Sequence, residues 1–366
     1  MSKIDISLGQ DGLGLDWANG DSQAYPYIWL RDNDPARLHP DTAERVGDLL
    51  DIPECPVAAE AELVEDAISI RWTDGEISNF PLSWLAAHRP GRSAADAAAV
   101  EPQTWRDDLI VPRHQAEAIA ASESDLLAWL SETAALGLSI VEGVATADGA
   151  GLALAQRIGF LRQTNFGISF EVMNKPDPNN LAYTALALPL HTDLPNQELP
   201  PGYQFLHCIA NEADGGGSVF ADGLTLAETL RASDPVAFDL LAQTPVPFRF
   251  HDSDTDLRVH RPVINLRPDG RVHEIKWNAH IAGVFDMAPE IMPAYYHAYR
   301  KFMQLTRDPA FQVRLKLKAG EMVVFDNRRV LHGRDAFDPS TGFRHLQGCY
   351  VDRGEFLARI RVLSRP

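Results

Sequence analysis

The chain has 366 residues, of which 45% are hydrophobic and 23% are charged, and these values are ordinary for a globular protein with one large and one small domain. A formal net charge of −18 at pH 7 disfavours nucleic acid or an anionic membrane as a partner and is compatible with a cationic small substrate. We expect no membrane segment, because no apolar run approaches the roughly 20 residues that span a bilayer. We also expect a cytoplasmic protein, because the N-terminus lacks the apolar core of a signal peptide and the three cysteines have no framework spacing.

Residues 1–95 are predicted to form a small β-rich domain. Residues 68–72 alternate in polarity as a half-buried strand does, and Thr73-Asp74-Gly75 directly after them is a turn signal. Residues 80–85 begin a helix-like segment.

The stretch over residues 89–111 is rich in Pro, Gly and Ala. We therefore place a linker at residues 96–112 and the main domain at residues 113–366.

The main domain is predicted to combine short strands with a few helices. Ser122 is suited to cap the first helix, and Thr225 and Glu228 have the spacing of a capping box at the start of the third. The mixture predicts a mainly β fold with flanking helices and fits a double-stranded β-helix, or jelly-roll, barrel. The expected helices cover residues 123–136, 152–161, 225–233 and 289–307.

A His-x-Asp motif lies at the centre of residues 182–223. In an extended segment, residues i and i+2 point to the same face, so His191 and Asp193 can aim at one point while Thr192 points away. An imidazole and a carboxylate on one face supply two members of the 2-His-1-carboxylate triad that holds non-heme Fe(II). Taken alone, the motif is weak, and a solvated turn that carries a capping Asp is the favoured interpretation.

A second motif lies near the C-terminus and makes the signal specific. Residues 320–334 are predicted to form a buried strand, a turn and a second strand that carries His332 as the third metal ligand. Arg344 follows twelve positions later, and its planar guanidinium is suited to bind a carboxylate. Arg334 and Arg328 are the second choices for this role.

With these motifs the chain resembles the 2-oxoglutarate-dependent non-heme iron oxygenases of the taurine dioxygenase superfamily. It is more closely similar to the γ-butyrobetaine and trimethyllysine hydroxylases. The similarity extends from the Trp-Leu-Arg-Asp-Asn segment at residues 29–33 to Asp352, and it is most specific in residues 174–183 and 200–208.

The resemblance implies Fe(II) as the metal, 2-oxoglutarate as the cosubstrate and O2 as the oxidant. It also implies hydroxylation of an unactivated C–H bond in a trimethylammonium compound, with γ-butyrobetaine, which would yield carnitine, as the favoured substrate. The alternatives are 2-trimethylaminoethylphosphonate, trimethyllysine, another small acid, or a ligand-binding barrel that has lost turnover.

The resemblance further implies which residues bind the two organic ligands. Ser218 would help Arg344 to hold 2-oxoglutarate, and Asn180 and Asn278 would hold the substrate carboxylate. Four aromatic residues match the cage around the trimethylammonium group, although each of them alone could be plain core: Phe166, Phe170, Tyr183 and Tyr350. The chain departs from the family pattern just after Asn278, so a phosphonate in place of the carboxylate stays open. Extra donors for it could come from Tyr203, His280, Arg258, His260 and Arg261, although the last three also suit a solvated strand.

The related hydroxylases carry a structural zinc site in the N-terminal domain, and this chain departs from it. Asp34, Ala36 and His39 stand where cysteines are expected, and Glu76 stands where a histidine is expected. Structural zinc is therefore predicted to be absent, with a site rebuilt from Asp34, His39 and Glu76 as the alternative. The resemblance also implies a homodimer, formed with the help of this domain.

Overall fold

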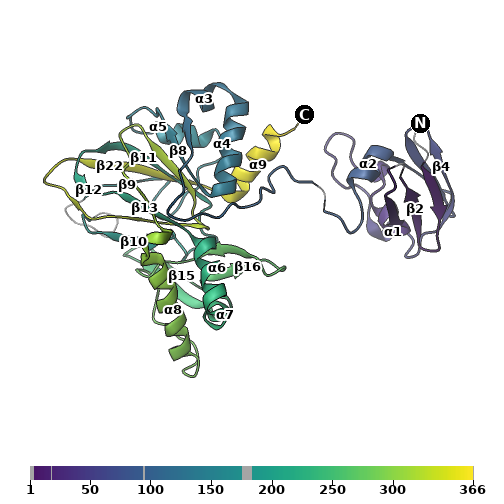
Figure 1. Cartoon of the computed structure of the whole chain (residues 1–366). Coiled ribbons are helices and arrows are strands. Elements are labelled where there is room, and N and C mark those ends of the chain that lie inside the picture. The colour runs from purple at the N-terminus through teal and green to yellow at the C-terminus, as the bar shows by residue number, and fades with distance from the viewer. Residues whose placement is uncertain (1–3, 18, 94, 175–183, 366) are drawn as a thin grey trace. The chain divides into compact units, whose positions relative to one another are not determined.

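The computed structural model describes residues 4–17, 19–93, 95–174 and 184–365. The chain divides into two compact units, Met1–Asp96 and Ala97–Pro366 (Figure 1). Among the described residues, no helix is both long and apolar enough to cross a bilayer.

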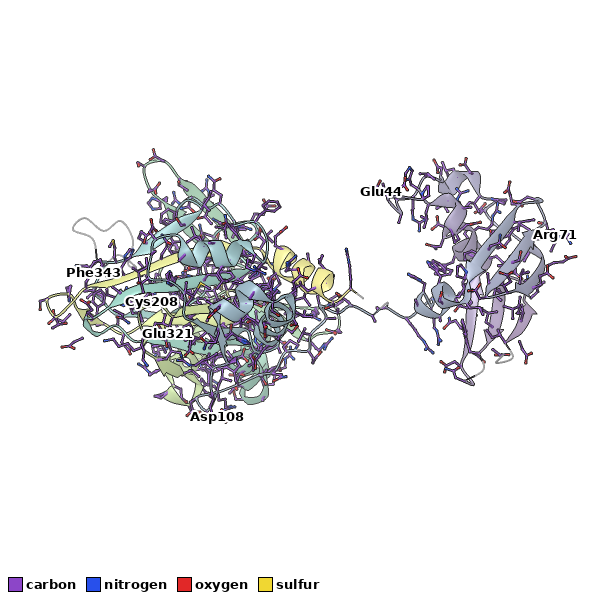
Figure 2. The ribbon with its side chains drawn as sticks, turned by 90° about the horizontal axis from the view of Figure 1, so that it is seen from above. Glu44, Arg71, Asp108, Cys208, Glu321 and Phe343 are labelled. Carbon is purple, nitrogen blue, oxygen red and sulfur yellow. The ribbon has the colours of Figure 1, made fainter. Side chains whose placement is uncertain are left out.

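The first unit contains two three-stranded antiparallel sheets around one hydrophobic core. Strand β5 buries Ile68, Ile70 and Trp72, which is the alternation predicted for this segment. Arg71 of the same strand is exposed (Figure 2). The strands are β1 (Asp5–Leu8), β2 (Gly12–Asp16), β3 (Ser22–Pro26), β4 (Ala58–Val64), β5 (Ala67–Trp72) and β6 (Ile77–Pro81). The helices are α1 (Tyr27–Asp32) and α2 (Leu82–Ala87), with 3-10 turns η1 (Pro35–Arg37) and η2 (Leu49–Asp51).

The second unit is built on two sheets that share a hydrophobic core. The six-stranded sheet has the order β7 (Arg113–Gln115), β8 (Leu138–Glu142), β19 (Met322–Asp326), β11 (Tyr203–Asn211), β22 (Arg344–Val351) and β9 (Ser169–Val172). The four-stranded sheet has the order β10 (Leu188–His191), β20 (Val330–Arg334), β13 (Ser218–Asp222) and β18 (Val313–Leu315). Residues of both sheets pack together, among them Ile140, Phe220, Val313 and Phe325. Adjacent strands are antiparallel except β7 and β8.

Helices cover the other face of the six-stranded sheet (Figure 1). They are α3 (Ala116–Ala121), α4 (Glu123–Leu136), α5 (Ala150–Gln156) and α9 (Arg353–Leu363). The α4 bounds and its Ser122 cap are confirmed, because the Ser122 hydroxyl accepts a hydrogen bond from Asp125 N at 3.2 Å. The prediction over residues 152–161 was too long at its C-terminal end, since α5 ends at Gln156.

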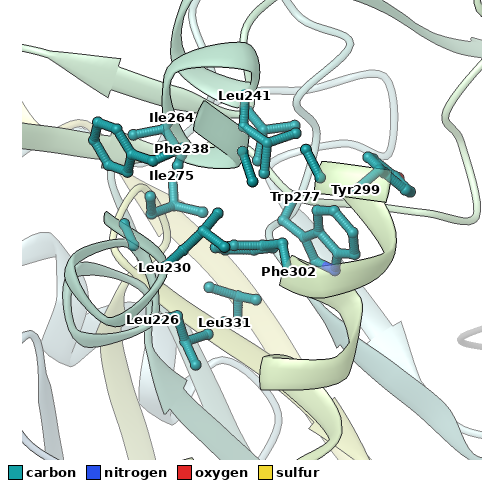
Figure 3. Packing of buried hydrophobic residues seen from close by; sticks show 14 of the residues in the cluster. Leu226, Leu230, Phe238, Leu241, Ile264, Ile275, Trp277, Tyr299, Phe302 and Leu331 are labelled. Carbon is teal, nitrogen blue, oxygen red and sulfur yellow. The ribbon is translucent and has the colours of Figure 1, made fainter. Parts of the chain in front are cut away.

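A second hydrophobic core lies beside the four-stranded sheet, between helices and short hairpins (Figure 3). Its helices are α6 (Gly223–Ser233), α7 (Pro235–Gln243) and α8 (Met292–Arg307). One hairpin pairs β14 (Val246–His251) with β15 (Asp256–Arg261), and the other pairs β16 (Ile264–Leu266) with β17 (Val272–Ile275). Elsewhere in this unit, β12 (Asp214–Gly215) pairs with β21 (Phe337–Asp338). The 3-10 turn η4 (Pro309–Phe311) follows α8.

The capping box predicted at Thr225 is wrong. Helix α6 begins two residues earlier, where Asp222 accepts a hydrogen bond from Leu224 N at 3.1 Å. The Thr225 hydroxyl instead donates to the Trp105 carbonyl at 2.9 Å, a contact between segments far apart in the sequence.

Part of the stretch predicted as a linker packs in the second unit. Trp105 and Val111 are buried in the core between the sheets. The Trp105 indole donates to the Leu136 carbonyl at 2.8 Å, and Gln103 N donates to the Ala135 carbonyl at 2.8 Å.

Candidate active site

Strand pairing brings the two halves of the predicted metal site together. β10 and β20 are antiparallel neighbours, and His191 lies directly opposite His332 in their register. Asp193 follows two residues after His191, and the ligand atoms of the three side chains all lie within 4.8 Å of one another. Among the residues that the structure describes, this is the only group of His, Cys, Asp or Glu side chains close enough to share a metal ion.

The two imidazoles converge on one carboxylate oxygen. The Nε2 atom of His191 lies 3.2 Å from Asp193 Oδ1, and the Nε2 atom of His332 lies 3.7 Å from the same oxygen. The Nδ1 atom of His191 lies 2.9 Å from the Pro189 carbonyl, which can only accept a hydrogen bond. Nδ1 therefore carries the proton in neutral His191, and the Nε2 lone pair faces the other two ligands.

The local electrostatics favours the protonation states that a metal requires. Burial and the neighbouring His191 lower the pKa of His332 to about 3, so this imidazole is neutral near pH 7. Burial alone would raise the pKa of Asp193, but His332, His191 and the Tyr350 hydroxyl hold it well below its ordinary range. Two imidazoles and one carboxylate match the donor set of non-heme Fe(II) sites.

The triad lies in the wall of a cavity of about 150 Å³. Aromatic rings line it: Phe170 stacks on Tyr350 with ring centroids 5.1 Å apart, and Phe166 meets Phe250 edge-on at 5.3 Å. Ser218, Arg334 and Arg344 also line the cavity. The same cavity is therefore lined by the His-Asp-His triad, by aromatic ring faces and by cationic side chains.

Arg344 is the group in this cavity that most clearly lacks a counterpart. It is buried, and its Nε and Nη1 atoms have no hydrogen-bond partner in the described parts of the chain. Burial and the nearby Arg334 lower the pKa of Arg344 to about 10, so the guanidinium is still charged at pH 7. A buried cation with unused N–H groups is strongly stabilised by an anion, and the carboxylate of 2-oxoglutarate suits its planar fork.

The structure places several other predicted residues at the cavity. Asn278 lines it, but its side chain is already engaged, because Nδ2 donates to the Thr192 carbonyl at 3.2 Å and Oδ1 accepts from His280 N at 3.1 Å. His280 lines the cavity as well. The predictions for Asn180 and Tyr183 fall outside the described residues.

Tyr203 is not brought to the cavity. Its ring packs against Phe356 with centroids 3.6 Å apart, in the core under the helices. Gln204, the next residue of β11, lines the cavity, and successive side chains of a strand point to opposite faces.

The other basic residues predicted from the sequence differ in whether they reach the cavity. Arg334 lines the cavity, whereas Arg328 donates to the Pro200 carbonyl at 2.6 Å. On β15, Arg261 donates to the Glu198 carbonyl at 3.0 Å and His260 contacts Asp286 at 2.8 Å. Neither Arg261 nor His260 lines the cavity.

Sequence reasoning missed several cavity residues, among them Asn196, Gln204 and Phe250. Phe250 had a signal in the sequence, since Phe248 and Phe250 repeat two residues apart in β14. The two amides had none, because polar residues next to a motif are common at surfaces.

The residues at the altered zinc position make local contacts in the first unit. Asp34 accepts hydrogen bonds from Ala36 N at 2.9 Å and from the Ser78 hydroxyl, and His39 Nδ1 accepts from Asp41 N at 3.3 Å. The absence of structural zinc, and any metal binding by Asp34, His39 and Glu76, stay predictions.

Residues 96–350 match the family model described as taurine catabolism dioxygenase TauD, TfdA family. The chain is 44% identical over 361 residues to the gamma-butyrobetaine dioxygenase of Pseudomonas sp. (strain AK-1), covering 97% of this chain and 94% of that protein. It is 30% identical over 377 residues to the gamma-butyrobetaine dioxygenase of Homo sapiens, covering 100% and 97%. The crystal structure of a taurine dioxygenase from Burkholderia xenovorans matches with a TM-score of 0.51 at 15% identity, over 68% of this chain and 91% of that chain, which supports the fold alone.

Proposed function

The chain belongs to the TauD, TfdA family of dioxygenases, and from this premise we propose that it hydroxylates γ-butyrobetaine to carnitine with Fe(II), 2-oxoglutarate and O2. One observation carries the proposal: the same cavity is lined by a His-Asp-His triad, by stacked aromatic rings and by a buried arginine whose Nε and Nη1 atoms have no hydrogen-bond partner among the described residues. The similarity to two gamma-butyrobetaine dioxygenases supports the choice of substrate.

His191, Asp193 and His332 would hold the iron, and Arg344 with Ser218 would hold the far carboxylate of 2-oxoglutarate. When bound, iron and 2-oxoglutarate supply the oxidising chemistry, which places one oxygen atom of O2 in the substrate and the other in succinate and releases CO2. The protein would keep the His332 imidazole neutral, present a cation to the cosubstrate and fix the reacting C–H bond near the metal.

The aromatic wall would hold the trimethylammonium group. A quaternary ammonium has no N–H bond to donate, so ring faces with their negative quadrupole are the natural partners for it. Phe166, Phe170 and Tyr350 are the described members of the proposed cage, Phe250 adds a fourth ring, and Tyr183 stays an expected member. Asn278 Nδ2 donates one of its two hydrogens to the Thr192 carbonyl, and with its second hydrogen it would hold the substrate carboxylate together with the expected Asn180.

For the architecture, we infer that the two sheets of the second unit form a double-stranded β-helix, or jelly roll. Mostly antiparallel strands in two sheets that share a core support this inference. We also propose that residues 1–95 form a small N-terminal domain, that residues 96–112 connect it, and that residues 113–366 form the oxygenase domain.

The protein would act as a homodimer in the cytoplasm. Free cysteines support a reducing compartment, since Cys55, Cys208 and Cys349 form no disulfide with one another. Sedimentation equilibrium of the purified protein tests the dimer, and a single species of monomer mass at micromolar concentration would contradict it.

Succinate formation by the iron-loaded protein tests the proposed function. γ-Butyrobetaine, 2-trimethylaminoethylphosphonate and trimethyllysine are supplied singly with 2-oxoglutarate, against a blank without substrate. We expect strong stimulation by γ-butyrobetaine. Stimulation by the phosphonate alone would show that the phosphonate is the substrate. His280, which lines the cavity, could then supply a further hydrogen-bond donor to the phosphonate group. No stimulation by any of the three compounds would contradict the trimethylammonium proposal.

A further inference from the structure

We propose that Tyr350 has two roles in the active site: its ring forms part of the wall that receives the substrate cation, and its hydroxyl orients Asp193 as an iron ligand. The first role belongs to the proposed function, on which this inference rests. The second makes Tyr350 a positioning residue for the metal.

The two oxygens of the Asp193 carboxylate have different neighbours. Oδ1 faces the Nε2 atoms of both histidines, at 3.2 and 3.7 Å. Oδ2 accepts a hydrogen bond of 2.7 Å from the Tyr350 hydroxyl. This bond occupies one oxygen and leaves the other for the metal, as the outer partners of metal-binding carboxylates commonly do.

The backbone of Asp193 is fixed independently by Asn327. The Asn327 side chain accepts from Asp193 N at 2.7 Å and donates to the Asp193 carbonyl at 3.0 Å, and it is fully buried. The next residue, Leu194, has a φ of 54°, a left-handed conformation that a leucine keeps only where its surroundings hold it. Because the main chain is held in this way, the Asp193 carboxylate can still rotate, and the hydrogen bond from the Tyr350 hydroxyl restricts this rotation.

The ring of Tyr350 is also held in place. It stacks on Phe170 at a centroid distance of 5.1 Å and an angle of 29°. Gly348, on the neighbouring strand to Phe170, leaves the space that this ring needs, because a Cβ there would lie 2.3 Å from Phe170 Cζ. The Tyr350 side chain that would contact the substrate cation is therefore the same side chain that hydrogen-bonds to Asp193.

This arrangement couples the substrate to the metal site. A cation against the ring face draws electron density from the phenol and makes its hydroxyl a stronger hydrogen-bond donor to Asp193. Substrate binding should therefore tighten metal binding, and metal binding should tighten substrate binding by the same factor.

The test compares Tyr350→Phe with Tyr25→Phe. Tyr25 lies in the first unit, is not among the residues that line the cavity, and donates its hydroxyl to the Leu85 carbonyl at 2.7 Å. Its variant therefore loses a buried hydrogen bond of equal length. Mn(II) affinity is measured by titration with and without saturating γ-butyrobetaine, in the presence of 2-oxoglutarate, and thermal melting verifies that each variant is folded.

We expect Tyr350→Phe to weaken Mn(II) binding about 10-fold or more without γ-butyrobetaine, the range typical of lost outer partners. Tyr25→Phe should match the wild type. γ-Butyrobetaine should tighten Mn(II) binding to the wild type, and much of this effect should be lost in Tyr350→Phe. The affinity of Tyr350→Phe for γ-butyrobetaine should fall only a few-fold, because the ring is kept.

Unchanged Mn(II) affinity in Tyr350→Phe, or an equal loss in Tyr25→Phe, would overturn the positioning role. The titration without γ-butyrobetaine needs no substrate, so its result stands apart from the proposed function. A wild-type protein that binds Mn(II) but no trimethylammonium compound would instead defeat the proposed function.

Discussion

At the metal site, each of the three side chains depends on a different neighbour. The Pro189 carbonyl selects the proton position of His191, and the Tyr350 hydroxyl holds one oxygen of Asp193. The His332 ring lies against Phe325, with centroids 4.7 Å apart, which contributes to the burial that keeps this imidazole neutral. Metal affinity is therefore expected to be sensitive to these neighbours as well as to the ligands.

Removal of a ligand is the first prediction at this scale. His191→Ala or Asp193→Ala should reduce succinate formation to background while the far-ultraviolet circular dichroism spectrum stays that of the wild type, because each variant leaves only two protein ligands. Full turnover in either variant would show that the metal is held elsewhere.

The second prediction concerns Arg344. Arg344→Lys should raise the KM for 2-oxoglutarate about 10-fold or more, since an ammonium keeps the charge but loses the planar fork. Arg258→Lys, on an exposed position of β15, is the control and should leave this KM unchanged. Equal KM values for the Arg344 variant and the wild type would remove Arg344 from the cosubstrate site.

At the scale of strands and helices, local signals predicted local structure well. Helix α4 was predicted with its bounds, because the Ser N-cap and the helical spacing of its apolar residues are both local signals. In the structure, a glycine with φ of 73° ends this helix. The triad was also predictable, since two short motifs carry all its members. Tyr203 was misassigned because the face that a strand residue occupies depends on pairing with β19 and β22, which lie more than 100 residues away in the sequence.

The packing of β9 on β22 gives the third prediction. Gly348→Ala should displace the Phe170 ring and raise the KM for γ-butyrobetaine on the order of 10-fold, because the added methyl group has no free space. Gly354→Ala is the matched control, since a Cβ at that glycine meets nothing within 4 Å. Wild-type KM in the Gly348 variant would mean that Phe170 does not contact the substrate.

At the scale of the whole molecule, a buried charge network connects distant parts of the second unit. Glu274 contacts Lys276 at 2.6 Å, Arg328 at 3.1 Å and Arg353 at 3.4 Å. Arg328 and Arg353 come from the turn after β19 and from the start of α9, and Arg328 also binds the carbonyls of the segment that follows Asp193. Arg328 therefore joins this network to the segment that follows Asp193.

This network gives the fourth prediction. Burial would raise the pKa of Glu274, but Lys276, Arg353 and Arg328 lower it from 4.5 to about 2. A carboxyl group with a lowered pKa stabilises the fold above its unfolded pKa and loses this contribution as the pH falls toward its folded pKa. Glu274→Gln should lower the free energy of unfolding by about 3 kcal/mol at pH 7, and the difference from the wild type should narrow between pH 5 and pH 2.

Urea unfolding at several pH values measures this difference. Asp256→Asn is the control, because its ion pair with Arg249 is largely exposed and should contribute little to the free energy of unfolding. A Glu274 variant as stable as the wild type would show that the network is replaceable by neutral hydrogen bonds.

The most direct measurement of the central claim is the fate of isotope-labelled O2 during turnover with γ-butyrobetaine. If the cavity holds Fe(II), 2-oxoglutarate and the betaine together, mass spectrometry should find one labelled atom in carnitine and one in succinate, with the two products formed in equal amounts. Succinate without labelled carnitine, or carnitine whose hydroxyl oxygen comes from water, would contradict the assignment of this protein as a γ-butyrobetaine dioxygenase.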